Sequence, residues 1–270
     1  MQRCGGDSVF VYDAALFRIS VFRPDGEYSR AVPMQEWMPN GLPPYGFWCH
    51  HGGVLAFVHR TADRPRNEGP LRHDVEISIV DRNDSSISLG TFPASEMYFK
   101  APAAGPRHLG KKTTVAVGSN SVYVGTGDAF EVTTFSFRGE RVGTLRDARA
   151  PIPVTPAQVT TYIKELIASR PSRVNTSRYE QYFRDLEWPK VYPAYARLMV
   201  DGSDNLWIEE YPIPGRDIRQ WSIYANSGVR IAMISLPKGF RLLEAGRDYV
   251  LGVWRDQDDV DCIKVYKLVK

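Results

Sequence analysis

Ten ionisable side chains lie where apolar runs of this sequence begin or end, positions from which a side chain can reach a ligand. They are Asp13, His59, Arg60, Lys111, Asp128, Arg197, Glu209, Glu210, Arg241 and Arg255. Guanidinium and ammonium groups recognise anions through charge and hydrogen bonds, and carboxylates recognise cations. The set therefore predicts binding of a polar or charged ligand. For any single member, the alternative is a solvated position or an ion pair within the set.

Sequence motifs for catalysis are missing from the chain. It contains no Gly-x-Ser-x-Gly, no P-loop and no His-Glu-x-x-His. A hard cation needs oxygen ligands, and Asp13, Asp128 and Glu209 or Glu210 could supply them from separate segments. We therefore expect no cofactor, with calcium as the alternative, and the question of catalysis stays open.

Composition and charge narrow the range of partners. The chain has 270 residues, of which 43% are hydrophobic and 24% charged, as in an ordinary globular protein. The net charge of +3 comes from interspersed charges, which argues against a nucleic-acid partner. The densest basic stretch, residues 59–74, is expected to be a solvated loop, with an anion-binding patch as the alternative.

No apolar run is long enough to span a membrane. The cysteines, Cys4, Cys49 and Cys262, have no metal-binding spacing, and we expect no disulfide framework.

A short pattern recurs along the chain and indicates its fold. Each copy has Gly, Asp, Asn or Ser in a turn, followed by β-branched and aromatic residues typical of a strand. The copies are GDSVFVYD (6–13), GGVLAFVH (52–59), SNSVYVGT (119–126), SDNLWIEE (203–210) and GRDYVLGV (246–253). Phe10, Tyr123 and Trp207 occupy the same point of the pattern, which predicts packing between repeats.

Further strand candidates flank each copy, so that the repeat is a unit of four antiparallel strands. Its length of about 40 residues plus insertions is typical of the blade of a β-propeller. A two-sheet sandwich is the alternative, and it would show evenly spaced strands without a recurring four-strand unit. We predict an all-β fold, a single β-propeller domain over residues 1–270 with about five blades.

One segment, residues 147–195, interrupts the pattern and is expected to be helical. Within it, Thr155, Pro156 and Gln158 form a capping-box sequence that predicts a helix over 155–172. A shorter helix is predicted from Ser177 to Leu186. Both helices are expected between two blades.

The long insertions are predicted to share one face of the propeller. Alternate connections in a blade emerge on opposite faces, and the long ones all fall in the same class. They are residues 59–74, 93–112, 147–195 and 210–217. Because loops on a rigid scaffold commonly carry binding groups, this face is the predicted working face.

Three stretches, GDSVFVYDAALFRISVFRPDGEYSR (6–30), DGSDNLWIEEY (201–211) and residues 236–268, resemble a known family. It is the six-bladed, NHL-like β-propeller family of exported proteins and lipoproteins of environmental bacteria. The resemblance implies a periplasmic or cell-envelope location and no assigned catalytic residues. It also implies that a first blade and a lipoprotein segment are missing, because only three residues precede Cys4 and the last repeat ends after its third strand. Cys4 is then the end of a first strand, and Gly5 to Asp7 form the following turn.

The predicted function is non-catalytic binding of a small molecule or protein on the face with the insertions. A calcium-dependent, lactonase-like hydrolase with its site at the channel mouth is the alternative, and a purely structural role is a third. Open sheet edges at the two ends of the chain also predict self-association.

Overall fold

A computed structural model describes residues 2–4, 8–13, 15–33, 46–49, 55–60, 67–80, 86–100, 103–169, 176–184, 186–256 and 260–268. Blade 1 consists of β1 (Gln2–Arg3), β2 (Val9–Asp13), β3 (Arg18–Phe22) and β4 (Tyr28–Pro33). Blade 2 consists of β5 (Gly46–Cys49), β6 (Leu55–Arg60), β8 (Asp74–Val80) and β9 (Ser86–Pro93).

Blade 3 consists of β12 (Thr114–Val117), β13 (Ser121–Gly125), β14 (Glu131–Ser136) and β15 (Arg141–Arg146). Blade 4 consists of β16 (Tyr195–Val200), β17 (Leu206–Glu210), β18 (Ile218–Tyr224) and β19 (Arg230–Pro237). Blade 5 has three strands in the described residues: β20 (Phe240–Ala245), β21 (Tyr249–Arg255) and β22 (Asp261–Lys267).

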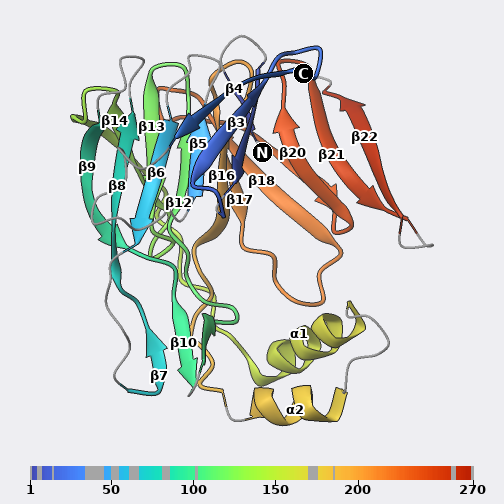
Figure 1. The fold of residues 1–270 in the computed structure, drawn as a ribbon. Coiled ribbons are helices and arrows are strands. Elements are labelled where there is room, and N and C mark those ends of the chain that lie inside the picture. Colours follow the sequence, from blue (N-terminus) through green and yellow to red (C-terminus); the bar gives the residue numbers. More distant parts are fainter. Residues whose placement is uncertain are drawn as a thin grey trace.

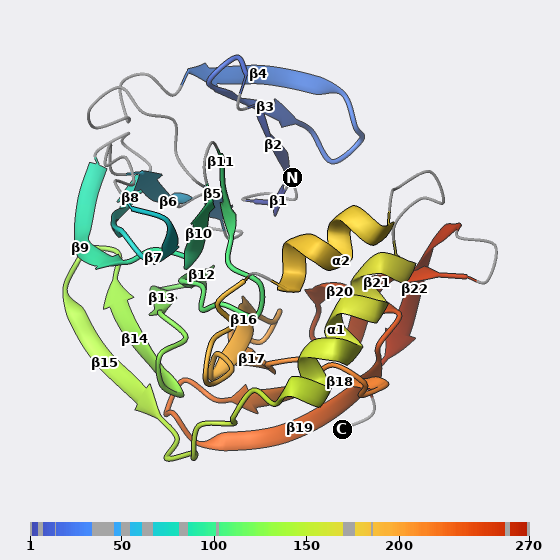
Figure 2. The ribbon, with the colours of Figure 1, turned by 90° about the horizontal axis from the view of Figure 1, so that it is seen from below.

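The blades stand side by side around a centre, as predicted (Figure 2). In each one the strands pair antiparallel in chain order. The first strands (β1, β5, β12, β16 and β20) lie toward the centre, and the last strands lie outside (Figure 2). This radial arrangement differs from the alternative sandwich, in which two sheets would enclose one core. Within the described residues there are five such blades.

Apolar side chains are buried between successive blades. One cluster joins Ile77 and Ile79 of blade 2 to Val115 and Val122 of blade 3. Blades 3 and 4 meet in a second cluster, and blades 4 and 5 in a third.

The recurring aromatic residues lie in these clusters, as the repeat predicts. Tyr123 packs at the interface of blades 3 and 4, Trp207 packs at the interface of blades 4 and 5, and Phe10 is buried in blade 1. Because side chains point alternately to the two sides of a strand, a blade can present one apolar face to each of its neighbouring blades.

The turn between β16 and β17 shows how the repeat sequence fixes a hairpin. The carboxylate of Asp201 accepts hydrogen bonds from the backbone N–H groups of Ser203 and Asn205, at 2.8 and 2.9 Å. It also accepts one from Trp207 Nε1 at 2.9 Å. One buried carboxylate therefore holds the turn and orients the indole that packs between blades.

The insertions gather on one face, which we call the insertion face (Figure 1). It carries β7 (Gly69–Leu71), β10 (Met97–Lys100), β11 (Ala103–Pro106), α1 (Pro156–Ala168) and α2 (Thr176–Arg184). Strands β11, β10 and β7 form a small extra sheet. The expectation of a solvated loop is therefore wrong for residues 69–71. Charge composition indicated exposure there, and the pairing of β7 with the distant β10 is a tertiary effect that composition does not contain.

Helix α1 begins as predicted. Thr155 Oγ1 accepts a hydrogen bond from the N–H of Gln158 at 3.3 Å, and Gln158 Oε1 accepts one from the N–H of Thr155 at 3.0 Å. Its apolar side packs toward the blades through Val159 and Tyr162. Neither helix in the described residues is long and apolar enough to cross a membrane.

Cys4 and Cys49 form a disulfide that the sequence analysis did not expect. Their Cα atoms lie 5.4 Å apart, although 45 positions separate them in the chain. Cys4 directly follows β1, and its N–H donates to the carbonyl of Ser8 at 2.8 Å, which closes the predicted turn. The turn residues 5–7 lie outside the described part. The bond ties blade 1 to the first strand of blade 2.

Candidate functional site

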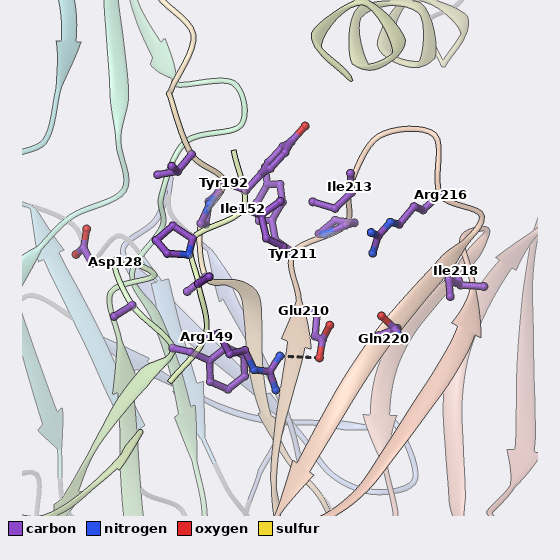
Figure 3. A pocket seen from close by; sticks show the side chains of 18 residues that line it. Asp128, Arg149, Ile152, Tyr192, Glu210, Tyr211, Ile213, Arg216, Ile218 and Gln220 are labelled. Atoms are coloured by element: carbon purple, nitrogen blue, oxygen red, sulfur yellow. Dashed lines mark hydrogen bonds and ion pairs between the residues drawn. The ribbon is translucent and has the colours of Figure 1, made fainter. Parts of the chain in front are cut away.

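A pocket opens on the insertion face between blades 3 and 4 (Figure 3). Its volume is about 170 Å³. One wall comes from the β13–β14 connection (128–130), and another from β17 and β18 with the loop between them. The segments that enter and leave the helical insertion, 149–152 and 191–194, complete the lining. Two of the four long insertions, residues 147–195 and 210–217, therefore line this pocket.

The two segments next to the helices form a short antiparallel ladder. The N–H of Val154 donates to the carbonyl of Lys190 at 3.0 Å, and the N–H of Tyr192 donates to that of Ile152 at 2.9 Å. Tyr192 and Ile213 are buried against Val159 and Tyr162. Helix α1 therefore packs on the apolar side chains that line the pocket.

Most of the lining is apolar and aromatic. The rings of Tyr192 and Tyr211 lie 5.3 Å apart at an angle of 33°. Burial raises the pKa of both hydroxyls, so they stay protonated. The Tyr192 side chain is 3% exposed, and its hydroxyl has no hydrogen-bond partner among the described residues. Buried hydroxyls are nearly always hydrogen-bonded, so this one is a candidate contact for a ligand.

Arg149 is anchored at the base of the pocket. Its guanidinium pairs with Glu210 at 2.7 Å and with Asp147 at 2.9 Å, and it lies 3.8 Å from the centroid of the Phe130 ring. Burial alone would raise the pKa of Asp147, but the hydrogen bonds from Arg149 and Tyr224 lower it below its ordinary 3.8. Arg149 is therefore saturated by two carboxylates and serves mainly to join blades 3 and 4.

The open side of the pocket carries further polar groups. Figure 3 shows Arg216, Gln220 and Glu210 converging on the same space below Ile213. Arg216 is exposed and makes no side-chain ion pair or hydrogen bond with the described residues. A guanidinium and an amide beside an apolar cavity can bind a carboxylate or carbonyl group.

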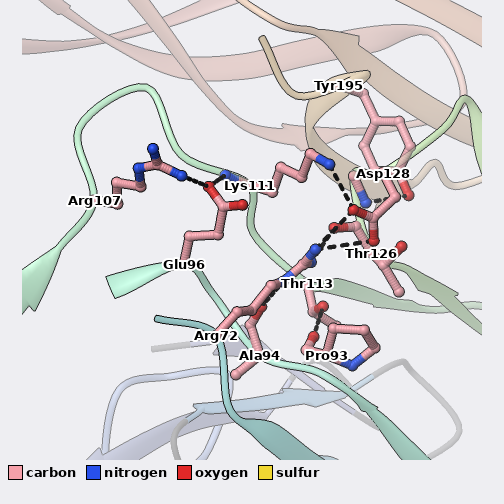
Figure 4. Close-up of polar contacts among 11 residues, drawn as sticks. Arg72, Pro93, Ala94, Glu96, Arg107, Lys111, Thr113, Thr126, Asp128 and Tyr195 are labelled. Carbon is pink, nitrogen blue, oxygen red and sulfur yellow. Dashed lines mark hydrogen bonds and ion pairs between the residues drawn. The ribbon is translucent and has the colours of Figure 1, made fainter. Parts of the chain in front are cut away.

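Asp128 lies at the edge of the pocket and belongs to an ion-pair cluster (Figure 4). Arg72 Nη1 contacts both its oxygens, at 2.8 and 2.9 Å, and Lys111 Nζ contacts one at 2.8 Å. Burial alone would raise the pKa of Asp128, but the hydrogen bonds from Lys111 and Thr126 and the charge of Arg72 lower it below its ordinary 3.8. The structure thus brings together Lys111 and Asp128 of the sequence-derived set.

Arg197 and Glu209 of that set also meet, between blades 4 and 5. Arg197 Nε lies 3.5 Å from Glu209 Oε2, and Arg219 Nη1 lies 2.8 Å from Glu209 Oε1. Glu210, the next residue, binds Arg149 on the opposite side of the blade. Two adjacent glutamates of β17 therefore serve two different interfaces.

The remaining members of the set do not join these clusters as binding groups. Asp13 Oδ1 accepts hydrogen bonds from the N–H groups of Ala15 and Leu16 and holds the turn after β2. Arg255 pairs with Asp261 at 3.0 Å on the surface. Arg241 is exposed on β20. His59 and Arg60 lie on β6, and their side chains are outside the described part.

A metal site does not form from these carboxylates in the described part of the chain. No group of three or more His, Cys, Asp or Glu side chains gathers there. Asp128 and Glu209 each pair instead with two cationic side chains.

Sequence reasoning did not identify Arg72, Arg149, Tyr192 or Arg216 individually. All four lie in insertions, where no strand periodicity indicates to which side a side chain points. One available signal was a pair of opposite charges two residues apart, Asp147 and Arg149. The aromatic residues beside prolines, Tyr192 and Tyr211, were a second one.

The sequence matches no known family profile and no curated protein. Its fold is similar to solved structures at low identity. A streptogramin B lyase is 10% identical with a TM-score of 0.42, over 99% of this chain and 67% of that chain. A DUF4221 protein from Bacteroides vulgatus is 10% identical with a TM-score of 0.48, over 97% and 76%. BamB from Moraxella catarrhalis is 11% identical with a TM-score of 0.37, over 98% and 70%.

The identification of the fold follows from the geometry of the blades themselves. Sheets of antiparallel strands in chain order pack face to face around a common centre, with first strands inward and last strands outward. This chain is a β-propeller.

Proposed function

We propose that this protein binds a small organic molecule in the pocket between blades 3 and 4. The observation that carries the proposal is the buried hydroxyl of Tyr192, a residue that lines the pocket, because this hydroxyl has no hydrogen-bond partner in the described residues. Leaving a buried hydroxyl unpaired costs about 1–3 kcal/mol. A ligand oxygen or nitrogen that reaches this hydroxyl would recover that energy.

The chemistry of the pocket favours a ligand with a ring or branched apolar body and a carboxylate. A cavity of about 150 Å³ holds a molecule the size of benzene, and this one is slightly larger. Tyr211, Ile152 and Ile213 offer apolar contacts, and Arg216 offers a free guanidinium at the opening. Because Arg149 is already neutralised, Arg216 is the side chain that would distinguish an acid from its neutral analogue.

The test uses benzoate and benzyl alcohol as probes, with binding followed by saturation-transfer NMR. Both probes should bind the protein, benzoate more tightly. Arg216→Gln should weaken benzoate and leave benzyl alcohol unchanged, because only the acid contacts the guanidinium. The matched control is Arg138→Gln, an exposed arginine at the β14–β15 turn on the other face. Failure of both probes to bind, or equal loss in the control, would refute the proposal.

Nothing in the described geometry specifically favours the calcium-dependent hydrolase that the sequence left open. A rise in Tm with calcium that Asp128→Asn abolishes would support that alternative. An unchanged Tm with each divalent ion would remove it.

We further propose a location in the cell envelope. The Cys4–Cys49 disulfide supports it, because disulfides persist in oxidising compartments. Thiol alkylation of protein extracted from its native cells, without reductant, tests this: only Cys262 should react. Reaction at all three cysteines would contradict it.

Self-association is the third part of the proposal. In the described part of the chain, β22 has no strand paired on its outer side. Its side chains Ile263 and Val265 are 73% and 60% exposed. Light scattering should show a mass that rises with concentration and falls in the double variant Ile263→Lys, Val265→Lys. A constant monomer mass would contradict this part.

A further inference from the structure

The ion pairs at the base of the pocket leave one negative charge in excess. The guanidinium of Arg149 pairs with the carboxylates of Asp147 and Glu210, at 2.9 and 2.7 Å. Two carboxylates of charge −1 and one guanidinium of charge +1 sum to a net charge of −1. Of the two carboxylates, that of Glu210 belongs to the lining of the pocket, and that of Asp147 does not. The excess charge therefore faces the pocket through Glu210.

Glu210 keeps one oxygen for a further donor. Its Oε1 accepts hydrogen bonds from Arg149 Nη1 at 2.7 Å and from Ser222 Oγ at 3.2 Å. Within the described residues Oε2 accepts none, and the side chain is 26% exposed. Figure 3 shows this second oxygen pointing away from Arg149. Because a carboxylate oxygen only accepts hydrogen bonds, a ligand group that fits here must be an N–H or O–H donor.

A positive charge borders the same space. Figure 3 shows the side chains of Arg216, Gln220 and Glu210 pointing toward one another across the open side of the pocket. Although Arg216 and Glu210 have opposite charges, the described part of the chain contains no ion pair between them. The amide of Gln220 offers both a donor and an acceptor beside them. The opening therefore presents one positive and one negative group that are not paired with each other.

Helix α1 holds the loop that carries Arg216. The N–H of Gly215, the preceding residue, donates to Glu165 Oε1 of α1 at 3.1 Å. The N–H of Arg216 donates to the carbonyl of Ile213 at 3.1 Å, and the Ile213 side chain is buried against α1. The backbone of Arg216 is thereby fixed at the pocket by contacts on both sides of the turn.

We propose that the ligand of this pocket is a zwitterion, an α-amino acid with an apolar side chain, an inference that rests on the pocket proposed above. The ammonium group donates to Glu210 Oε2 and to the side-chain carbonyl of Gln220, and the carboxylate accepts from Arg216. The apolar side chain lies in the cavity against Tyr211 and Ile152. A carboxylic acid without an amino group would match Arg216 and leave the excess charge at Glu210 without a partner.

The experiment is calorimetric titration of the full chain at neutral pH with three probes that differ by one group. Phenylalanine carries both charged groups, 3-phenylpropionate lacks the ammonium group and phenethylamine lacks the carboxylate. We expect phenylalanine to bind about tenfold more tightly than either of the others, which corresponds to one charge-assisted hydrogen bond. Equal affinities for phenylalanine and 3-phenylpropionate would overturn the assignment of an amino acid.

Glu210→Gln tests the contact with the ammonium group. The variant loses the negative charge and keeps an oxygen that can accept from Arg149. It should weaken phenylalanine and phenethylamine about tenfold. It should not weaken 3-phenylpropionate, and the binding of this probe also shows that the variant is folded. An unchanged affinity for phenylalanine, or an equal loss for 3-phenylpropionate, would overturn the role of Glu210.

The matched control is Glu140→Gln, which changes an exposed carboxylate in the β14–β15 turn on the other face. It should leave the affinities for all three probes unchanged. The failure of this inference differs from that of the pocket itself. If 3-phenylpropionate binds and the ammonium group adds nothing, the amino-acid assignment is wrong and the pocket stands. If 3-phenylpropionate, benzoate and benzyl alcohol all fail to bind, both proposals are overturned.

Discussion

Two guanidinium groups lie between blades of this propeller, and their surroundings differ. Arg149, between blades 3 and 4, has two carboxylates and a phenyl ring around it. Arg197, between blades 4 and 5, shares a single carboxylate with a second arginine. Both guanidinium groups stack on an aromatic ring, so both have the same structural role of packing between two blades. The charge balance is what differs, with two anions for one cation in the first and one anion for two cations in the second.

The comparison indicates which buried group at each interface lacks a partner among the described residues. Where the arginine is saturated, the unpartnered buried group is the neutral hydroxyl of Tyr192, next to an apolar cavity. Where the arginines are in excess, the unpartnered groups are N–H donors. The network around Arg149 contains enough carboxylates to balance its charge, whereas the network around Arg197 keeps an excess of positive charge.

The largest effect is expected for Glu209→Gln. Glu209 has a side chain only 5% exposed, and its loss leaves Arg197 and Arg219 without an anion. Removing one partner of a buried pair costs about 3 kcal/mol, measured by urea unfolding. Phosphate should restore part of this loss, because it replaces the missing anion and no longer competes with Glu209. If phosphate stabilises the variant no more than the unmodified protein, the two interfaces do not differ in the way that we describe.

Arg149→Met should have the next largest effect. The change leaves Asp147 and Glu210 facing one another and removes the stacking on Phe130. Because these side chains keep 26–30% exposure, the expected loss is smaller, about 2 kcal/mol. Arg138→Met, on the solvent-exposed turn, is the matched control and should be close to neutral. Phosphate should not stabilise Arg149→Met against unfolding, in contrast to Glu209→Gln. Stabilisation of Arg149→Met by phosphate would contradict the difference in charge balance between the two interfaces.

Tyr192→Phe tests the neutral group of the same interface. Without ligand it should stabilise the protein by about 1 kcal/mol, since it removes an unpaired buried hydroxyl. With ligand it should weaken both benzoate and benzyl alcohol. Tyr182→Phe, on a side chain that is 38% exposed, provides the control for the loss of a hydroxyl alone. A destabilised Tyr192→Phe would mean that the hydroxyl already has a partner.

The blades could be predicted from sequence because their physics is local and repeated. A turn residue followed by alternating apolar residues specifies each hairpin, and the recurrence of Phe10, Tyr123 and Trp207 specifies the interface between blades. The capping box of α1 is equally local. Connection lengths then placed the insertions on one face, because strand direction alternates.

The sites could be predicted only in part, because they depend on contacts between distant segments. Glu209 and Glu210 were identified from their place at the end of a strand, but their partners Arg219 and Arg149 come from other elements. Arg72 reaches Asp128 over 56 positions. The Cys4–Cys49 bond has the same origin, since it requires the first strands of two blades to lie side by side. Charge composition carries no information of this kind.

The smallest effect concerns pH at the balanced interface. Asp147 has a lowered pKa in the folded protein, so its contribution to stability is complete above its ordinary pKa of 3.8 and is lost as pH falls through the lower folded value. Asp147→Asn should therefore be slightly less stable than the unmodified protein at pH 7, by less than about 1 kcal/mol. The difference should shrink below pH 3.8.

Urea unfolding of both proteins between pH 7 and pH 3 measures this difference. Glu140→Gln, which changes an exposed carboxylate in the β14–β15 turn, is the matched control. A constant difference for Asp147→Asn across the range would mean that its carboxylate acts through shape rather than charge. The description of Arg149 as a guanidinium neutralised by two anions would then hold for Glu210 alone. In that case only one carboxylate, that of Glu210, would balance the charge of Arg149, and the two interfaces would differ less in charge than the structure indicates.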